Sequence, residues 1–278
     1  MNLSIAFSTC PNDTFIFDAL VNNRITSGGF NFAKTLADIQ ELNTMALSGD
    51  VDIVKISFAL YPLISEKYQL LSAGAALGRG VGPLVISKRK IYPDEIQYAT
   101  VAVPGTHTTA NLLFSLAYPE VKKKRVFLFS DIEEAILDNE VDVGVIIHEN
   151  RFTYMKKGLR KISDLGDFWE TQTKLPIPLG GIAIKRSLPQ TIKLMVNQLV
   201  KTSVEFALEN PKASFDFVRN NAQAMEVEVM QKHIELYVNE FSVNIGEFGK
   251  KAVVELLASS DANKAEKVTD FKKLLFVD

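Results

Sequence analysis

The alternation of hydrophobic and polar positions is clearest in residues 140–154, which read E-V-D-V-G-V-I-I-H-E-N-R-F-T-Y. Valines first alternate with small or acidic residues, and two isoleucines then close the run. This pattern is typical of a strand that enters a core half-buried and ends buried on both faces. The run stops at His148, and ligands of open α/β sheets bind at the carboxyl ends of strands. His148 is therefore a candidate proton-transfer group, the alternative being a histidine that only hydrogen-bonds a neighbouring loop.

Other short apolar runs predict further strands, and apolar residues that recur every three or four positions predict helices. The expected strands are residues 3–7, 30–35, 51–57, 82–89, 99–104 and 179–186. The expected helices are residues 14–20, 38–47, 190–209, 212–220, 226–242 and 246–259, with two more that open near residues 105–110 and 130–133.

Several helix ends carry signals of their own. Asp13 or Thr14 is expected to cap the first helix, and Gly49 suits the left-handed end of the second. Residues 130–133, S-D-I-E, have the spacing of a capping box. A helix start leaves free backbone N–H groups, which bind anions, so the loop at residues 105–110 is a candidate anion site.

Two segments of the chain have matching sequence patterns, an internal echo. Residues 47–53, L-S-G-D-V-D-I, are matched by residues 137–143, L-D-N-E-V-D-V. Upstream of each segment, a predicted strand leads through a polar loop into a helix. The echo predicts two lobes, each a βαβαβ unit with a parallel sheet, in an α/β protein.

The polypeptide is expected to cross between the two lobes twice. Residues 82–89 and 179–186 are similar predicted strands that fit as two crossing connectors, and two crossings make a hinge. The first lobe is expected to comprise residues 1–92 and 186–278, with the C-terminal helices packed on it, and the second lobe residues 93–185.

Composition narrows the function classes. The 278 residues include 31 basic and 33 acidic side chains, a formal charge of -2, so there is no electrostatic footprint for nucleic acid or an anionic membrane. No apolar run is long enough to span a bilayer, and the first residues lack the features of a signal peptide. The single cysteine, Cys10, excludes an internal disulfide. We expect a soluble, cytoplasmic protein, and a homodimer stays open.

Four further residues are weighed against His148. His107 is a second candidate acid or base, although a histidine at a helix start often faces solvent. Cys10 precedes a helix start that would lower its pKa, but a small packed side chain is the more economical interpretation. Glu149 and Arg151 either orient the His148 ring or form a surface pair. Two other features are expected to be structural: His233 within its helix, and the K-K-K-R run at residues 122–125 as a solvated turn.

Three motifs together carry a resemblance to a known family. They are C-P-N-D-T-F at residues 10–15, G-x-H-T-T-A at residues 105–110 and I-H-E-x-R-F-T-Y at residues 147–154. In this order, and over essentially the whole chain, the sequence resembles the 1,4-dihydroxy-6-naphthoate synthases of the futalosine route of menaquinone biosynthesis. The resemblance implies a two-lobed type II periplasmic-binding-protein-like fold. One departure is Ser8-Thr9 before Cys10, where the family has a proline.

The resemblance also implies an activity and a site. The family converts cyclic dehypoxanthine futalosine to 1,4-dihydroxy-6-naphthoate without a cofactor or metal. His148 matches the general base, in the cleft between the lobes. The positions that match the family's substrate contacts are Lys55, Ile56, Ser57, Thr108 and Thr109.

The residue chemistry agrees with an anionic ligand. The product carries a carboxylate, and a helix start with two threonine hydroxyls binds such a group. Lys55 is expected to add a cation. Two other functions stay open, namely a chorismate dehydratase of the same pathway and a binding protein with the same lobes but no chemistry.

Overall fold

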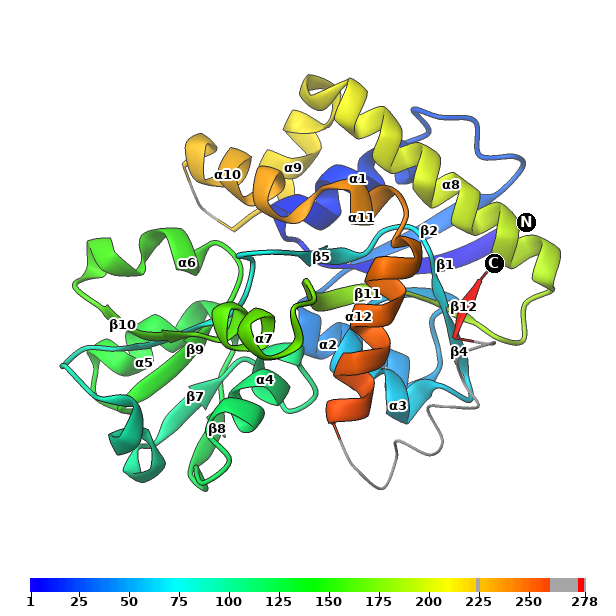
Figure 1. The fold of residues 1–278 in the computed structure, drawn as a ribbon. Helices are drawn as coiled ribbons and strands as arrows, with labels where there is room; N and C mark the ends of the chain where they lie inside the picture. The colour runs from blue at the N-terminus through cyan, green and yellow to red at the C-terminus, as the bar shows by residue number, and fades with distance from the viewer. Residues whose placement is uncertain (224–225, 261–274, 278) are drawn as a thin grey trace. The chain divides into compact units, whose positions relative to one another are not determined.

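The computed structural model describes residues 1–223, 226–260 and 275–277. The chain forms two compact units (Figure 1). Unit 1 comprises Met1–Gly78 and Pro178–Asp278, and unit 2 comprises Arg79–Ile177. Each unit has its own sheet and its own hydrophobic core, so each is described by itself.

The sheet of unit 1 is mixed. Its strands are β1 (Asn2–Phe7), β2 (Asn31–Leu36), β3 (Ile53–Ser57), β4 (Tyr68–Leu71), β5 (Ala76–Gly78), β11 (Ile177–Lys185) and β12 (Phe276–Val277). In the described part of the chain the order is β12-β4-β11-β3-β1-β2, and β5 pairs with β11. β1 runs parallel to β2 and β3, whereas β11 runs antiparallel to β3 and β4.

Helices cover this sheet. They are α1 (Pro11–Val21), α2 (Ile39–Ser48), α3 (Tyr61–Ile64), α8 (Gln190–Glu209), α9 (Phe215–Asn221), α10 (Val227–Tyr237), α11 (Glu240–Val243) and α12 (Gly246–Ser259), with 3-10 turns η1 (Phe58–Leu60) and η5 (Pro211–Ser214). α1 is almost wholly buried because α8, α9 and α10 pack against it (Figure 1). The prediction that the C-terminal helices pack on the first lobe is confirmed.

Unit 2 has a smaller mixed sheet. Its strands are β6 (Leu84–Ser87), β7 (Val101–Val103), β8 (Lys124–Val126), β9 (Val143–Ile146) and β10 (Arg160–Asp164), in the order β10-β6-β9-β7-β8. Its helices are α4 (Thr109–Ala117), α5 (Ile132–Leu137), α6 (Asn150–Thr153) and α7 (Leu165–Thr173), with 3-10 turns η2 (Pro93–Tyr98), η3 (Phe129–Asp131) and η4 (Tyr154–Lys157). β9 is buried along its whole length and lies between β6 and β7.

The predicted internal echo is present in both units. β1-α1-β2-α2-β3 places β1 between two parallel neighbours, and β7-α4-β8-α5-β9 does the same with β7. Gly49 ends α2 with a left-handed φ of 84°, and its counterpart Asn139 follows α5 with φ of 58°. The chain reverses in the same way at both places, which accounts for the matched segments.

The repeated aspartate has the same task in both halves. Asp52 accepts hydrogen bonds from the backbone N–H and hydroxyl of Ser4, each at 2.9 Å, and so anchors β1. Asp142 accepts a hydrogen bond from the backbone N–H of Thr100 at 2.8 Å, just before β7. In each half, the aspartate before the third strand accepts a hydrogen bond from a backbone N–H that lies within the first strand or directly before it.

The two strands that the sequence predicts as connectors each belong to one sheet. β6 pairs with β9 and β10 inside unit 2, and β11 pairs with β3 and β4 inside unit 1. The chain therefore passes into unit 2 after Gly78, earlier than the predicted boundary at residue 92. It leaves after Ile177 rather than at residue 185. The reason is that an antiparallel partner strand, which sequence does not reveal, decides where each segment belongs.

Three predicted helix ends are wrong. α1 starts at Pro11 with Cys10 as its N-cap, because the fixed φ of proline suits the first helical position, so neither Asp13 nor Thr14 caps it. The capping box at residues 130–133 does not form, since a 3-10 turn precedes α5 and no side chain caps that helix. The helix predicted at residues 226–242 breaks after Tyr237, and Asn239 caps the short α11.

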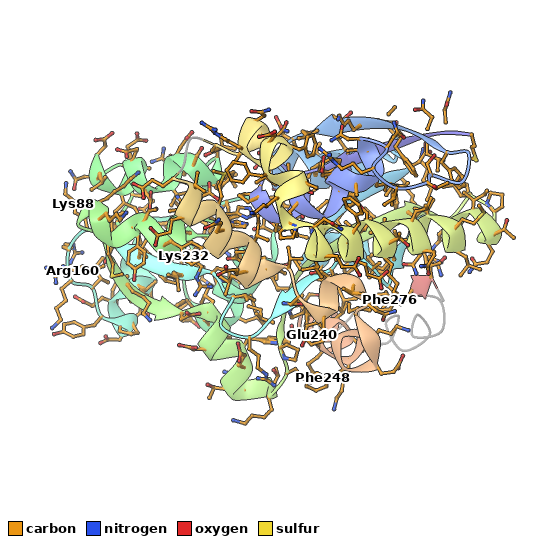
Figure 2. All side chains as sticks on the ribbon, turned by 90° about the horizontal axis from the view of Figure 1, so that it is seen from above. Lys88, Arg160, Lys232, Glu240, Phe248 and Phe276 are labelled. Carbon is orange, nitrogen blue, oxygen red and sulfur yellow. The ribbon has the colours of Figure 1, made fainter. Side chains whose placement is uncertain are left out.

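Charged side chains of both signs reach solvent. Lys88 and Arg160 of unit 2 and Lys232 and Glu240 of unit 1 are exposed (Figure 2). None of the helices within the described ranges is long and apolar enough to cross a membrane.

Candidate functional site

His148 lies two residues beyond the end of β9. Its φ of 57° is left-handed, which is uncommon for a residue other than glycine. Its half-buried ring packs edge-on against the Phe129 ring, with centroids 4.9 Å apart and planes at 71°. An unfavourable backbone conformation persists only where the surroundings impose it, and such residues cluster at functional sites. The geometry places the histidine just beyond the carboxyl end of a buried strand.

A buried carboxyl group adjoins this histidine. Glu149 is only 8% exposed, and burial raises its pKa to about 7, helped by the negative charge of Glu133. Glu133 is itself 2% exposed and forms an ion pair with Lys157 at 2.9 Å. Two carboxyl groups thus share one buried region, and a group with a pKa near 7 can exchange protons at neutral pH.

Arg151 belongs to a different contact. Its guanidinium pairs with Asp164 at 3.6 Å and donates a hydrogen bond to the backbone carbonyl of Gly82 at 3.1 Å. The surface pair between Glu149 and Arg151, one of the two sequence interpretations, is wrong in that Glu149 is buried and Arg151 binds Asp164. Arg151 ties α6 to the rest of unit 2.

The threonine loop lies at the start of α4. Thr108 is the N-cap: its hydroxyl donates to the Gly105 carbonyl at 2.9 Å and accepts from the Asn111 backbone N–H at 3.2 Å. Thr109 is the first residue of α4 and is also buried. α4 follows β7, and β7 lies parallel beside β9. Within unit 2, the loop and His148 therefore follow neighbouring parallel strands at the same edge of the sheet.

Lys55 does not lie in the site as a lone cation. It sits in the middle of β3, 4% exposed, and its ammonium pairs with Asp13 at 2.8 Å. Asp13 also accepts hydrogen bonds from the Ser8 hydroxyl at 2.7 Å and the Asn12 amide at 2.8 Å. The carboxylate that the sequence pattern assigned to a helix cap thus neutralises the predicted substrate-binding lysine.

The two residues after Lys55 complete β3. Ile56 is fully buried, and its backbone passes close to Gly180, where a side chain would lie 2.7 Å from the Ile56 carbonyl oxygen. The Ser57 hydroxyl accepts a hydrogen bond from the Asn43 amide at 3.1 Å, and the Asn43 carbonyl accepts one from the Ser57 backbone N–H at 3.0 Å. Asn43 of α2 therefore fixes the carboxyl end of the strand.

The remaining candidates are placed as follows. Cys10 is buried at the start of α1, which agrees with a packed side chain. His107 is half-buried in the loop before Thr108. Among the described residues, no group of three or more His, Cys, Asp or Glu side chains is arranged to hold a metal ion.

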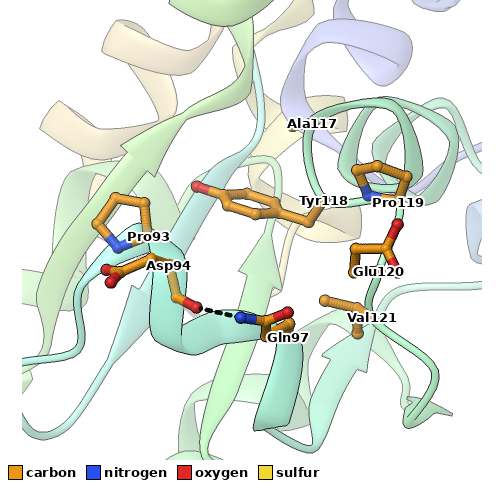
Figure 3. Close-up of a pocket in the computed structure, with 8 residues that line it drawn as sticks. All are labelled: Pro93, Asp94, Gln97, Ala117, Tyr118, Pro119, Glu120 and Val121. Atoms are coloured by element: carbon orange, nitrogen blue, oxygen red, sulfur yellow. Dashed lines mark hydrogen bonds between the residues drawn. The ribbon is translucent and has the colours of Figure 1, made fainter.

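Two pockets lie within single units, and neither includes a predicted site residue. One, of about 200 Å³ in unit 2, lies between η2 and the end of α4 and is lined by Asp94, Gln97 and Tyr118 among others (Figure 3). The other, of about 390 Å³ in unit 1, is mostly apolar and is lined by residues of α1, η5, α9 and α10. Neither supplies a catalytic group.

Sequence reasoning missed the buried contacts of three residues of unit 1, namely Asn12, Asp13 and His233. Asn12 and Asp13 lie inside the C-P-N-D motif, but the motif does not show that they contact β3. His233 of α10 is fully buried and lies 2.9 Å from the Asn12 carbonyl oxygen, although the pattern of its helix indicates a structural residue. A histidine on the buried face of an amphipathic helix was the signal that could have found it.

The two units, each built on a parallel βαβαβ core, define a two-lobed type II periplasmic-binding-protein-like fold. A Candida albicans protein described as exhibiting the generic periplasmic binding protein fold is similar over 99% of this chain and 96% of its own, with a TM-score of 0.72 and 11% identity. A crystal structure of an Archaeoglobus fulgidus protein is similar over 94% and 97%, with a TM-score of 0.89 and 33% identity.

Comparisons of the sequence show the family to which the chain belongs. A family model described as menaquinone biosynthesis matches residues 3–261, and the chain belongs to this family. A protein from Thermus thermophilus is 41% identical over 260 residues, 94% of each chain, and one from Streptomyces coelicolor is 43% identical over 265 residues, 94% of this chain and 93% of its own. Both relatives are named 1,4-dihydroxy-6-naphthoate synthase.

Proposed function

We propose that this protein is an enzyme that forms 1,4-dihydroxy-6-naphthoate, cleaving a carbon–carbon bond of cyclic dehypoxanthine futalosine in menaquinone biosynthesis. The observation that carries the activity is the identity of 41% and 43%, over nearly the full length, to two relatives named for it. The substrate and the cytoplasmic location come from the motif resemblance and the sequence composition.

His148 is the proposed general base. Its position after β9, its constrained backbone and its contact with Phe129 support this role. A base that removes a proton from the substrate prepares the neighbouring carbon–carbon bond for cleavage, and imidazole is suited to this at neutral pH. Glu149 is the adjacent group with a pKa of about 7.

The proposed substrate contacts are Lys55, Ile56 and Ser57 in unit 1 and Thr108 and Thr109 in unit 2. The start of α4 offers backbone N–H groups to the carboxylate of the ligand. Because Thr108 is already the helix cap, Thr109 and the backbone are the groups expected to contact the anion. Lys55 is expected to act together with its partner Asp13.

Turnover decides between this function and its two rivals. The purified protein is incubated with cyclic dehypoxanthine futalosine and, separately, with chorismate, and the naphthoate chromophore is followed. We expect the chromophore only with the first substrate. Turnover of chorismate would favour the dehydratase, and tight binding of a ligand without turnover would favour a binding protein.

The base assignment is tested with two histidine variants. His148→Asn is expected to lower kcat by about 10²–10⁴-fold while ligand affinity and the circular dichroism spectrum are kept, since general base catalysis typically contributes that much. His107→Asn is the matched control and is expected to change kcat far less. A folded His148→Asn enzyme with nearly full activity would remove His148 from the mechanism.

A further inference from the structure

A chain of buried polar side chains joins three elements of unit 1. The Lys55 ammonium on β3 pairs with Asp13 at 2.8 Å, the Asn12 amide donates to the same Asp13 oxygen at 2.8 Å, and the Asn12 carbonyl oxygen lies 2.9 Å from His233 Nε2. Asn12 and Asp13 belong to the first turn of α1, and His233 belongs to α10. The exposed fractions are 4%, 2%, 7% and 0% for Lys55, Asp13, Asn12 and His233.

The direction of each hydrogen bond follows from the chemistry of the groups. The Asp13 carboxylate accepts from the Lys55 ammonium and from the Ser8 hydroxyl, so it has no proton of its own to donate. Asn12 must therefore turn its NH₂ group to Asp13 and its oxygen to His233. It follows that His233 Nε2 carries a hydrogen and donates it to Asn12.

In this series of hydrogen bonds, the position of the Lys55 ammonium depends on His233. Without a donor at His233 Nε2, the buried Asn12 oxygen loses this hydrogen bond, and the Asn12 amide is no longer held in this orientation. The Asp13 carboxylate would then lose its donor from Asn12, and the ammonium that it holds would shift. Buried polar networks are rigid when they are fully satisfied and disturbed when one member is removed.

Lys55 keeps donor capacity for a ligand. An ammonium has three N–H donors. Within the described residues, the hydrogen bonds of Lys55 Nζ go to Asp13 at 2.8 Å and, at the long limit of 3.5 Å, to the Gly74 carbonyl. Gly180 of β11 pairs with Ser57, and a side chain at this position would lie 3.3 Å from Lys55 Cε, so the glycine leaves space for the lysine side chain.

We propose that His233 is a positioning residue for substrate binding, which acts through Asn12 and Asp13 to orient the Lys55 ammonium toward an anionic or carbonyl oxygen of the substrate. This inference rests on the proposed function in one respect, namely that Lys55 contacts the substrate. His233 itself touches neither the substrate nor the reacting atoms.

The experiment compares two replacements of the same histidine. His233→Phe keeps a flat ring but has no donor, whereas His233→Gln offers an amide N–H to Asn12. We expect the phenylalanine variant to raise KM roughly tenfold to a hundredfold, the loss that corresponds to one charge-assisted hydrogen bond. Its kcat is expected to stay within about threefold, since the general base is untouched, and the glutamine variant is expected to recover most of the KM.

A third variant controls for packing. Met230 lies on the same helix, is buried, and lines the apolar pocket of unit 1. Met230→Leu is expected to lower the free energy of unfolding somewhat and to leave KM unchanged. If all three variants changed activity only in proportion to their folded fraction, or if His233→Phe kept the wild-type KM, His233 would be structural and the inference would be overturned.

A measurement without substrate separates this inference from the proposed function. Long-range ¹H–¹⁵N NMR of labelled histidines in the wild-type protein is expected to show His233 protonated at Nε2. A wild-type protein that turns over neither substrate would remove the proposed function and with it the role of Lys55, whereas the NMR result would still decide the hydrogen-bonded chain. Turnover by the wild type together with a His233 that is protonated only at Nδ1 would overturn the inference alone.

Discussion

At the scale of single residues, the main cost in this molecule is the burial of charge. Lys55 and Asp13 meet this cost as an ion pair whose carboxylate accepts two further side-chain hydrogen bonds. Glu133 is buried against Lys157, and Glu149 lies near Glu133 with a raised pKa. The first cluster is charge-balanced, whereas the second has one more carboxyl group than ammonium groups. Burial is the main cause of the raised pKa of Glu149, and the negative charge of Glu133 adds to it.

The raised pKa predicts how stability depends on pH. A carboxyl group whose pKa rises from 4.5 in the unfolded chain to about 7 in the folded protein binds its proton more tightly when folded. The folded state is therefore favoured at pH 5, and this contribution is lost as pH rises to about 7, by about 3 kcal/mol in all. Urea unfolding from pH 5 to pH 8 measures this slope.

A matched variant isolates the effect, because Asp38, Asp52 and Asp164 also titrate with shifted pKa values. Glu149→Gln keeps the shape of the side chain and cannot ionise. We expect it to match the wild-type protein near pH 5 and to be more stable near pH 8. Parallel curves for the two proteins would show that Glu149 does not hold the proton.

What the sequence reveals about single residues depends on the distance of their partners. His148 is found because it ends an apolar run, which is a local pattern. The partner of Lys55 is not found, because Asp13 lies on another element and only the pairing of β1 with β3 brings the two near each other. A buried cation implies that an anionic partner exists, but the sequence does not show which carboxylate it is.

At the scale of elements, the parts with strong periodicity are predicted well. α8 and α12 have the predicted bounds, and β1, β3 and β9 lie within the predicted strands to about a residue. The short strands β4, β5, β8, β10 and β12 were not expected. β8 is an edge strand with three exposed residues, so the basic run at residues 122–125 is partly a strand and not only a turn. Because all three side chains of β8 are exposed, the strand has no alternation of buried and exposed positions that a sequence pattern could detect.

The start of α4 allows a prediction that separates capping from ligand binding. Thr108→Val removes the cap and is expected to lower the free energy of unfolding by about 1 kcal/mol, with little preference between ligands. Thr109→Val is expected to weaken binding of the naphthoate product roughly tenfold to a hundredfold, and to matter much less for its neutral amide. Titrations with the acid and the amide measure both effects.

The matched control is Thr108→Ser, which keeps the capping oxygen and is expected to retain stability. Equal losses of acid and amide binding in Thr109→Val would remove the anion from this loop. A Thr108→Val protein as stable as the wild type would mean that the cap contributes little to unit 2.

At the scale of the whole molecule, the echo in the sequence predicts the two-lobed fold because each half repeats the same chain reversals and the same strand-anchoring aspartate. The lobe boundaries were less predictable. β6 and β11 have nearly the same chemistry, and only the pairing of each with its own sheet assigns β6 to unit 2 and most of β11 to unit 1.

These assignments predict different behaviour for two fragments of the chain. Arg79–Ile177 is one continuous segment that holds all of β6 to β10 and the core formed by residues such as Ile86, Ile136 and Ile146. Expressed alone, it is expected to fold and to unfold cooperatively in urea. Its free energy of unfolding is expected to be roughly 5 kcal/mol, as for other domains of this size. Met1–Gly78 is the control and is expected to stay unfolded, because it lacks β11, which lies between β3 and β4, and α8, which covers α1. Far-UV circular dichroism and urea titration of both fragments measure this. An Arg79–Ile177 fragment without a cooperative transition would show that unit 2 depends on unit 1 for its fold.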